Sequence, residues 1–231
     1  MEKSTGKKWP VWDLPTRLGH GLFIVAMLLA WWSAETQRTD LHQWTGYGIF
    51  VLVISRLIWG FVGSKPSRFA TFVKGPRTVI DYLFSSPEDA QASLPSHKVV
   101  GHNPAGGWSV VLMLSLLLVQ SLSGLFNSDD ILFNGPLYHL VESEWQDRFG
   151  VVHDYAFNVL LVCIALHIAA VFFYTWRGKN LLKPMILGAD DDVYSDAPPK
   201  PSWRWLAILL IVAVALWAAV QSAPQPTSQW F

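Results

Sequence analysis

The sequence predicts an all-α integral membrane protein, a four-helix transmembrane bundle followed by a fifth C-terminal transmembrane helix. The first observation is composition: of 231 residues, 52% are hydrophobic and only 15% are charged, whereas a water-soluble domain carries about 25% charged residues. The second is distribution, because the apolar residues gather in five runs with the length and polarity of membrane spans. The third is the richness in aromatic residues, 14% of the chain with 13 tryptophans, which are typical of membrane–water interfaces.

The charge balance and the cysteine count exclude several classes of protein. The 17 basic and 17 acidic residues give a formal net charge of zero, so no basic field indicates nucleic-acid binding. Cys163 is the only cysteine and lies inside an apolar run, which excludes an internal disulfide, an iron–sulfur cluster and a zinc site built on thiolates. The sequence also lacks a C-x-x-C-H motif, so no cofactor is attached through paired cysteines.

The first predicted span covers residues 18–32 and follows a basic N-terminal segment. A basic segment before an apolar run is also the pattern of a secretory signal peptide. No small-x-small cleavage site follows the run, which ends in Ala30-Trp31-Trp32-Ser33 with aromatic residues where a membrane interface is expected. We therefore expect an uncleaved transmembrane helix.

Four further apolar runs are predicted to cross the membrane, at residues 42–61, 105–126, 151–176 and 203–220. The polar connection at residues 63–104 contains a short amphipathic segment, 76–83, that is expected to lie on the membrane surface. The chain is thus divided into a four-span membrane domain at 1–188, an acidic, proline-rich linker at 189–202, and the fifth span with a short outer tail at 203–231.

The distribution of Lys and Arg predicts a cytoplasmic N-terminus and a C-terminus on the outer side. Cytoplasmic segments of membrane proteins carry an excess of Lys and Arg. With five spans and the N-terminus inside, the outer segments keep only Arg38 and Arg148. The cytoplasmic segments collect Lys3, Lys7, Lys8, Arg17, Lys65, Arg68, Lys74, Arg77, Lys98, Arg177, Lys179, Lys183, Lys200 and Arg204.

Two histidines share the fourth span. His153 and His167 are fourteen residues apart, which on an α-helix is about 21 Å along the axis and about 40° from the same face. An imidazole inside the membrane costs free energy unless it has a polar partner or binds a metal, so such histidines are candidates for function. One helix is therefore expected to offer two imidazoles to one side, one near each membrane surface.

The predicted topology pairs these two histidines with two others by depth. His42 lies near the outer end of the second span, level with His153, and His20 lies near the cytoplasmic end of the first span, level with His167. Each pair can supply two axial imidazoles to one haem iron held between facing helices. A hydrogen-bonded side chain without a cofactor is the alternative for any one histidine, and four histidines at matched depths make that alternative the weaker one.

Glycines flank the histidines of the first two spans. Gly19 and Gly21 surround His20, and Gly46 and Gly48 follow His42. Glycine on an apolar helix indicates either close helix packing or room for a bulky ligand. Beside the histidines, we expect these four positions to leave room for a macrocycle.

Two arginines are candidates for binding the propionates of such a haem. Arg56 lies in the cytoplasmic half of the second span, where a guanidinium needs an anion or a route to the headgroups. Arg17 lies near the predicted inner centre and could likewise bind a propionate or extend to the headgroups. His97, His102 and His139 fall in connections; His139 could compete with His42 or His153.

Several short motifs, in their order and spacing, resemble the bacterial cytochrome b561 and nickel–iron hydrogenase cytochrome b subunit family. The resemblance covers about residues 10–188. It includes PTRLGH at 15–20, HQWTG at 42–46 with RL at 56–57, GHNP at 101–104, the histidines of the fourth span, and KNLLK at 179–183. The fifth span departs from the usual four-span plan, which leaves the redox partner open.

The resemblance implies a dihaem b-type cytochrome: an all-α integral membrane protein with a four-helix haem-binding transmembrane bundle plus a fifth C-terminal transmembrane helix. It implies that His20, His42, His153 and His167 bind two haem b groups in the bacterial inner membrane. Such proteins pass electrons between membrane quinone and a redox partner at the outer face. A homo-oligomer is compatible with the sequence.

The function expected on this basis is transmembrane electron transfer. Two axial histidines leave no open position on the iron, which suits one-electron transfer. The partner at the outer side is expected to be a periplasmic c-type cytochrome or another redox protein. The acidic connection that contains Asp129, Asp130, Glu142 and Glu144 could attract a basic partner, but an ordinary solvated loop is the more common reason for such charges. Two alternatives stay open: a superoxide:quinone oxidoreductase acting at the outer haem, and a membrane anchor or electron-accepting subunit of a hydrogenase-like complex.

Overall fold

The computed structural model describes residues 9–84, 103–128, 134–178, 180–188 and 198–223. Within these residues the chain is helical and contains no β-strand; Ser128 and Asn134 form an isolated bridge. The predicted all-α fold class is confirmed. Residues 189–197 of the predicted linker, together with His97, His102, Asp129 and Asp130, lie outside the described residues.

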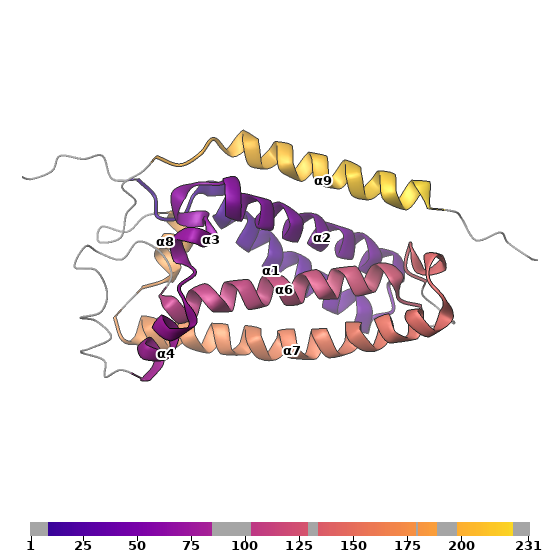
Figure 1. The fold of residues 1–231 in the computed structure, drawn as a ribbon, viewed down its shortest axis with the longest axis horizontal. Helices are drawn as coiled ribbons and strands as arrows, with labels where there is room; N and C mark the ends of the chain where they lie inside the picture. The colour runs from indigo at the N-terminus through magenta and orange to yellow at the C-terminus, as the bar shows by residue number, and fades with distance from the viewer. Residues whose placement is uncertain (1–8, 85–102, 129–133, 179, 189–197, 224–231) are drawn as a thin grey trace, which may run out of the picture. The chain divides into compact units, whose positions relative to one another are not determined.

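Five helices of the described chain are long and apolar enough to cross a membrane. They are α1 (Leu14–Glu35), α2 (Thr39–Val62), α6 (Pro104–Phe126), α7 (Ser143–Trp176) and α9 (Ser202–Ser222) (Figure 1). Each predicted span lies inside one of these helices. The prediction of a multi-pass membrane protein with five spans is therefore confirmed. The largest difference is at α7, which begins at Ser143 rather than at residue 151 because a polar first part, with Glu144 in the first turn and bonded to Arg148, extends the helix.

Shorter helices follow the ends of the spans. They are η1 (Lys65–Ser67), α3 (Phe69–Phe72), α4 (Pro76–Phe84), η2 (Tyr138–Leu140) and α8 (Leu182–Leu187). The helix α4 confirms the predicted helical segment at 76–83. Ile80, Leu83 and Phe84 remain exposed on it, as expected of an amphipathic helix whose apolar side meets the membrane interface.

The contacts divide the chain into two compact units, and each unit contains one pair of the predicted site histidines. Unit 1 comprises Met1–His20, Arg56–Leu112 and Ile164–Trp205, and therefore includes His20 and His167. Unit 2 comprises Gly21–Ser55, Met113–Cys163 and Leu206–Phe231, and therefore includes His42 and His153. The domain boundaries predicted at residues 188 and 202 stay a prediction.

The buried carboxylate of Asp13 organises unit 1. One oxygen, Oδ1, accepts the backbone N–H of Thr16 at 3.0 Å and so caps α1. The other, Oδ2, accepts the indole N–H of Trp59 at 2.9 Å, which joins the end of α2 to the start of α1. The Thr16 hydroxyl lies 2.9 Å from that of Ser67, which adds η1 to the same cluster.

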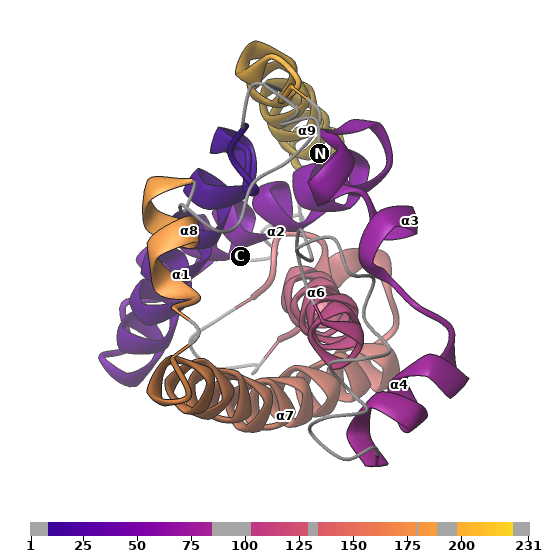
Figure 2. The same cartoon turned by 90° about the vertical axis from the view of Figure 1, so that its left-hand side faces the viewer.

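Two short helices pack on the spans of unit 1. Helix α8 lies beside the first turns of α1, where the guanidinium of Arg17 donates to the carbonyl of Ile186 (Figure 2). Helix α4 lies beside the end of α7, and the hydroxyls of Tyr82 and Tyr174 are 2.9 Å apart. The Asn103 side chain donates to the Tyr174 hydroxyl at 3.0 Å, so the beginning of α6 is fixed at the same place.

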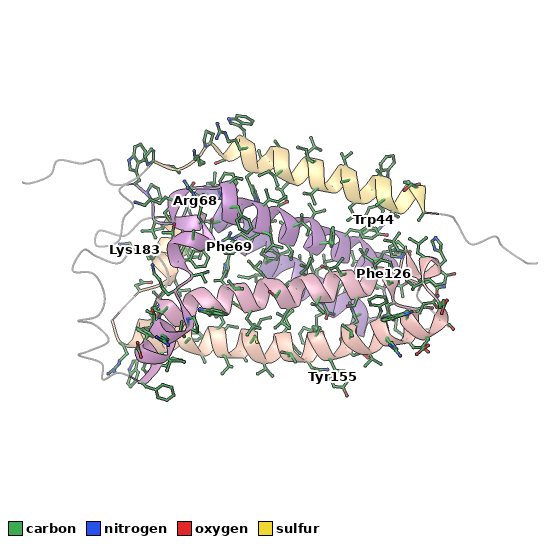
Figure 3. All side chains as sticks on the ribbon, viewed as in Figure 1. Trp44, Arg68, Phe69, Phe126, Tyr155 and Lys183 are labelled. Atoms are coloured by element: carbon green, nitrogen blue, oxygen red, sulfur yellow. The ribbon has the colours of Figure 1, made fainter. Side chains whose placement is uncertain are left out.

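The lipid-facing character of the helices is visible in their side chains. Many large apolar residues of α1, α7 and α9 are exposed, which in a membrane-spanning helix means contact with lipid tails. Figure 3 shows the side chain of Tyr155 pointing outward from α7, and the residue has a relative solvent-accessible area of 71%.

Helix α9 packs through a stripe of large residues. In unit 1, Trp205 is only 4% exposed, and in unit 2, Val212 and Leu216 are buried. A Cβ at Gly19 would lie 3.6 Å from the Trp205 indole. The predicted macrocycle space at Gly19 is therefore wrong: this bare position accommodates the fifth helix, by the close packing that small residues allow in membranes.

Candidate functional site

His42 and His153 face each other within unit 2. His42 lies in the first turns of α2 and His153 in α7, and their ring centres are 6.2 Å apart with an angle of 76° between the ring planes. These are the two residues that were predicted to share the outer level of the membrane.

Backbone carbonyls orient both rings of this pair. The Nδ1 atom of His42 lies 2.9 Å from the carbonyl oxygen of Ala30, and Nδ1 of His153 lies 2.9 Å from that of Gln120. Because a carbonyl only accepts, each Nδ1 carries a proton, and in the neutral imidazole the lone pair is then on Nε2. The protein thereby holds both histidines in the tautomer that can bind a metal through Nε2.

A cavity of about 330 Å³ lies between the helices of unit 2 and is lined by both histidines. Gly46 also lines it, and a Cβ at this position would meet no atom within 4 Å. The expected free space beside His42 is therefore present at Gly46.

Polar side chains also line this cavity, and sequence reasoning did not identify them. They are Glu35, Gln43, Tyr47, Gln120, Ser121, Asn127 and Asp154. The Gln43 amide donates to the Tyr47 hydroxyl at 2.7 Å, across one helical turn. Asp154 could have been identified from the sequence, because a carboxylate directly after His153 in an apolar run is a candidate for function.

His20 and His167 form the second pair, in unit 1. His20 comes from α1 and His167 from α7, with ring centres 6.4 Å apart and 55° between the ring planes. Within the ranges that the structure describes, no residue makes a hydrogen bond to either ring. The structure thus brings together the same two pairs that depth predicted; their role as haem ligands stays a prediction.

The spacing of both pairs fits a metal held between two imidazoles. A metal–imidazole bond is about 2.1 Å, so two rings on opposite sides of one metal have centres roughly 6 to 7 Å apart. No group of three or more His, Cys, Asp or Glu residues that could hold a metal occurs among the described residues. A metal at either pair would therefore need most of its ligands from a cofactor, as iron has in a porphyrin.

Arg17 has an unsatisfied donor beside the second pair. It precedes His20 by three residues on α1, and residues three apart are neighbours on a helix surface. One end of its guanidinium donates to the Ile186 carbonyl, whereas its buried Nε has no hydrogen-bond partner among the described residues. A buried N–H without an acceptor costs free energy, and a carboxylate on a bound ligand would satisfy it.

Arg56 is held by unit 1 itself. Its Nη1 donates to the Ser67 carbonyl at 3.3 Å, and its guanidinium lies 5.4 Å from the ring centre of Phe69. These two contacts hold the guanidinium of Arg56 within unit 1.

His139 lies apart from the cavity. It belongs to η2, its ring centre is 5.6 Å from that of Tyr138, and it does not line the cavity between His42 and His153. Both of its ring nitrogens are buried, and no described residue gives either of them a hydrogen bond. The structure therefore does not bring His139 to the position where it would compete with His42 or His153.

Comparison with known proteins identifies the family. A family model described as prokaryotic cytochrome b561 matches residues 11–188, which include all four paired histidines, whereas α9 lies beyond the match. No curated protein sequence matches the chain. Because the match covers well over half of the chain and agrees with its membrane helices, the chain belongs to the prokaryotic cytochrome b561 family, which implies electron transfer in the membrane by b-type haem.

Proposed function

We propose that the chain is a transmembrane electron carrier with two b-type haems, one bound by His42 and His153 and the other by His20 and His167. The observation that carries this proposal is the pair of ring-centre distances, 6.2 and 6.4 Å, in two separate pairs. When bound, each haem would supply an iron that gains and loses one electron, and each histidine pair would hold one such group.

The protein contributes orientation and charge at each centre. The carbonyls of Ala30 and Gln120 fix the rings of His42 and His153. At the other centre, Arg17 offers its buried Nε to a propionate. Arg56 is proposed as a second cationic contact, because the described residues provide one hydrogen-bond acceptor, the Ser67 carbonyl, for its five N–H groups.

The proposed orientation puts the N-terminus in the cytoplasm and the C-terminus in the periplasm of a bacterial inner membrane. The His42–His153 centre would then lie toward the periplasm. Glu142, Glu144 and Asp147 are exposed at the start of α7, and their charge would favour a basic partner such as a c-type cytochrome. Membrane quinone or quinol is the proposed partner within the bilayer.

Two alternatives can be separated from this proposal. Superoxide is an anion, and the carboxylates Glu35 and Asp154 line the cavity beside the His42–His153 pair, which disfavours its approach. Reduction of the haem by superoxide but not by quinol would favour the superoxide:quinone oxidoreductase. Copurification of a stoichiometric soluble oxidoreductase would favour a membrane subunit of a hydrogenase-like complex.

The experiment that tests the proposal is a haem count on the full-length protein and on its histidine variants. Pyridine haemochrome analysis should return two b-type haems per chain. His42→Ala and His153→Ala should each remove one and the same haem, and His20→Ala and His167→Ala the other. A single haem in the wild-type protein, or losses grouped in other pairs, would contradict the proposal.

A further inference from the structure

The two histidine pairs differ in the hydrogen bonds made by their rings. Both rings of the His42–His153 pair donate through Nδ1 to a backbone carbonyl at 2.9 Å. Among the described residues, neither ring of the His20–His167 pair has such an acceptor. An Nδ1–H that donates to a carbonyl makes the opposite nitrogen a more basic ligand, and a more basic ligand stabilises the oxidised metal.

Ser123 adds a second acceptor at His153. Its Oγ lies 3.2 Å from Nδ1 of His153 and donates to the same Gln120 carbonyl at 3.0 Å. Ser109, on the same helix α6, also donates its hydroxyl to a backbone carbonyl, that of Gly106 at 2.8 Å, but it belongs to unit 1 and does not line the cavity of the His42–His153 pair. Of these two serines, Ser123 is the one whose hydroxyl lies within hydrogen-bond distance of a histidine ring.

The charges of the two units also differ. Among the described residues, unit 1 contains ten Lys and Arg against two carboxylates, Asp13 and Asp81, whereas unit 2 contains two arginines against six carboxylates. Two of those six, Glu35 and Asp154, line the cavity of the His42–His153 pair, and no Lys or Arg does. Negative charge near a redox centre stabilises its oxidised form, and positive charge stabilises its reduced form.

We propose that the His42–His153 centre has the lower reduction potential of the two, so that a single electron given to the oxidised protein resides at the His20–His167 centre. The hydrogen bonds to Nδ1 and the surrounding negative charge both lower the reduction potential of the His42–His153 centre. The inference rests on the proposed binding of two haems, and it gives internal electron transfer a downhill direction, from His42–His153 to His20–His167. Ser123 is a positioning residue, acting through His153.

The test is a potentiometric titration of the full-length holoprotein in detergent, followed by the visible absorbance of the reduced haems. Two one-electron components are expected. Ser123→Ala should raise the lower midpoint potential and leave the upper one in place, whereas the control variant Ser109→Ala, on the same helix but outside the cavity, should move neither. Ser123 is buried, so its variant could fold poorly, and an exposed residue provides a second test. Glu35→Gln removes a negative charge that lines the cavity and should also raise the lower midpoint potential. Its control is Asp147→Asn, which removes an exposed charge that does not line the cavity and should shift that potential less.

Several outcomes would overturn the inference. They are a single shared midpoint for both haems, a shift of the upper midpoint in Ser123→Ala or Glu35→Gln, and an equal shift in the control variants. The haem count separates this failure from that of the proposed function. A protein with two haems and the opposite order of potentials contradicts only the inference, whereas a protein with fewer than two haems contradicts the function on which it rests.

Discussion

Gly124 of α6 lies directly against the ring of His153, so that a Cβ at position 124 would be 2.9 Å from the ring atom Cε1. Real Cβ atoms essentially never approach another atom that closely, and the ring cannot move freely because its Nδ1 lies 2.9 Å from the Gln120 carbonyl oxygen. The absence of a side chain at Gly124 therefore helps determine where His153 can lie.

The first prediction follows from this contact. Gly124→Ala should displace the His153 ring and lower the haem content from two toward one per chain, because overpacking at a fixed site costs about 1 to 3 kcal/mol. Pyridine haemochrome analysis measures the loss. The control is Gly75→Ala, outside the spans, where an added Cβ meets no atom within 4 Å; equal haem content in both variants would contradict the prediction.

The second prediction concerns the fifth helix. Trp205→Ala should remove the indole that packs beside Gly19 and destabilise the protein by about 3 kcal/mol, the usual cost of truncating a buried aromatic residue. The measurement is thermal unfolding in detergent, followed by haem absorbance. Trp203→Ala, at an exposed position of the same helix, should change the unfolding temperature little, and an equal loss in both variants would indicate that α9 does not pack specifically.

The third prediction concerns the buried carboxylate of unit 1. Asp13→Ala removes the cap of α1 and leaves the Trp59 indole N–H without its acceptor. The expected cost is about 2 to 3 kcal/mol in the free energy of unfolding, from the cap and the unpaired donor together. Asp40→Ala, at an exposed residue in the first turn of α2, is the matched control and should cost less than half as much.

The fourth prediction is a pH dependence outside the spans. Burial raises the pKa of the Tyr82 phenol to about 12, and its contact with Tyr174 acts in the same direction. Because the folded pKa exceeds the ordinary value of about 10, the stabilising contribution of Tyr82 is complete below about pH 10 and is lost as the pH rises through 12.

Tyrosinate absorbance measures this titration. Subtracting the curve of Tyr82→Phe from that of the wild type should isolate one late-ionising tyrosine, and Tyr174→Phe should bring that component to lower pH. A difference curve centred near the ordinary tyrosine value in the wild type would contradict the assignment.

Much of the architecture could be predicted because the membrane limits the choices. Apolar runs identify the spans, and the depth of a histidine in its span follows from chain direction, which is why His20 lies near His167 and His42 near His153. Tertiary contacts could not be predicted in the same way. Nothing in the sequence around Gly19 indicates that Trp205, far along the chain, occupies its bare side.

The orientation of the histidine rings was also beyond the sequence. The acceptors for His42 and His153 are main-chain carbonyls of Ala30 and Gln120, and a backbone carbonyl leaves no mark in residue type. The polar lining of the cavity was missed for a related reason, since Glu35 and Gln43 fall at span ends, where polar residues are ordinary.

One continuous helix, α7, contributes a histidine to each pair. The separation between these two ligands is therefore set by the regular rise of a helix and does not depend on any loop. Inserting one residue between His153 and His167 would turn everything beyond it by about 100° and carry one imidazole away from its partner. The connections between spans can change in length without this penalty, whereas the fourteen-residue interval within α7 cannot.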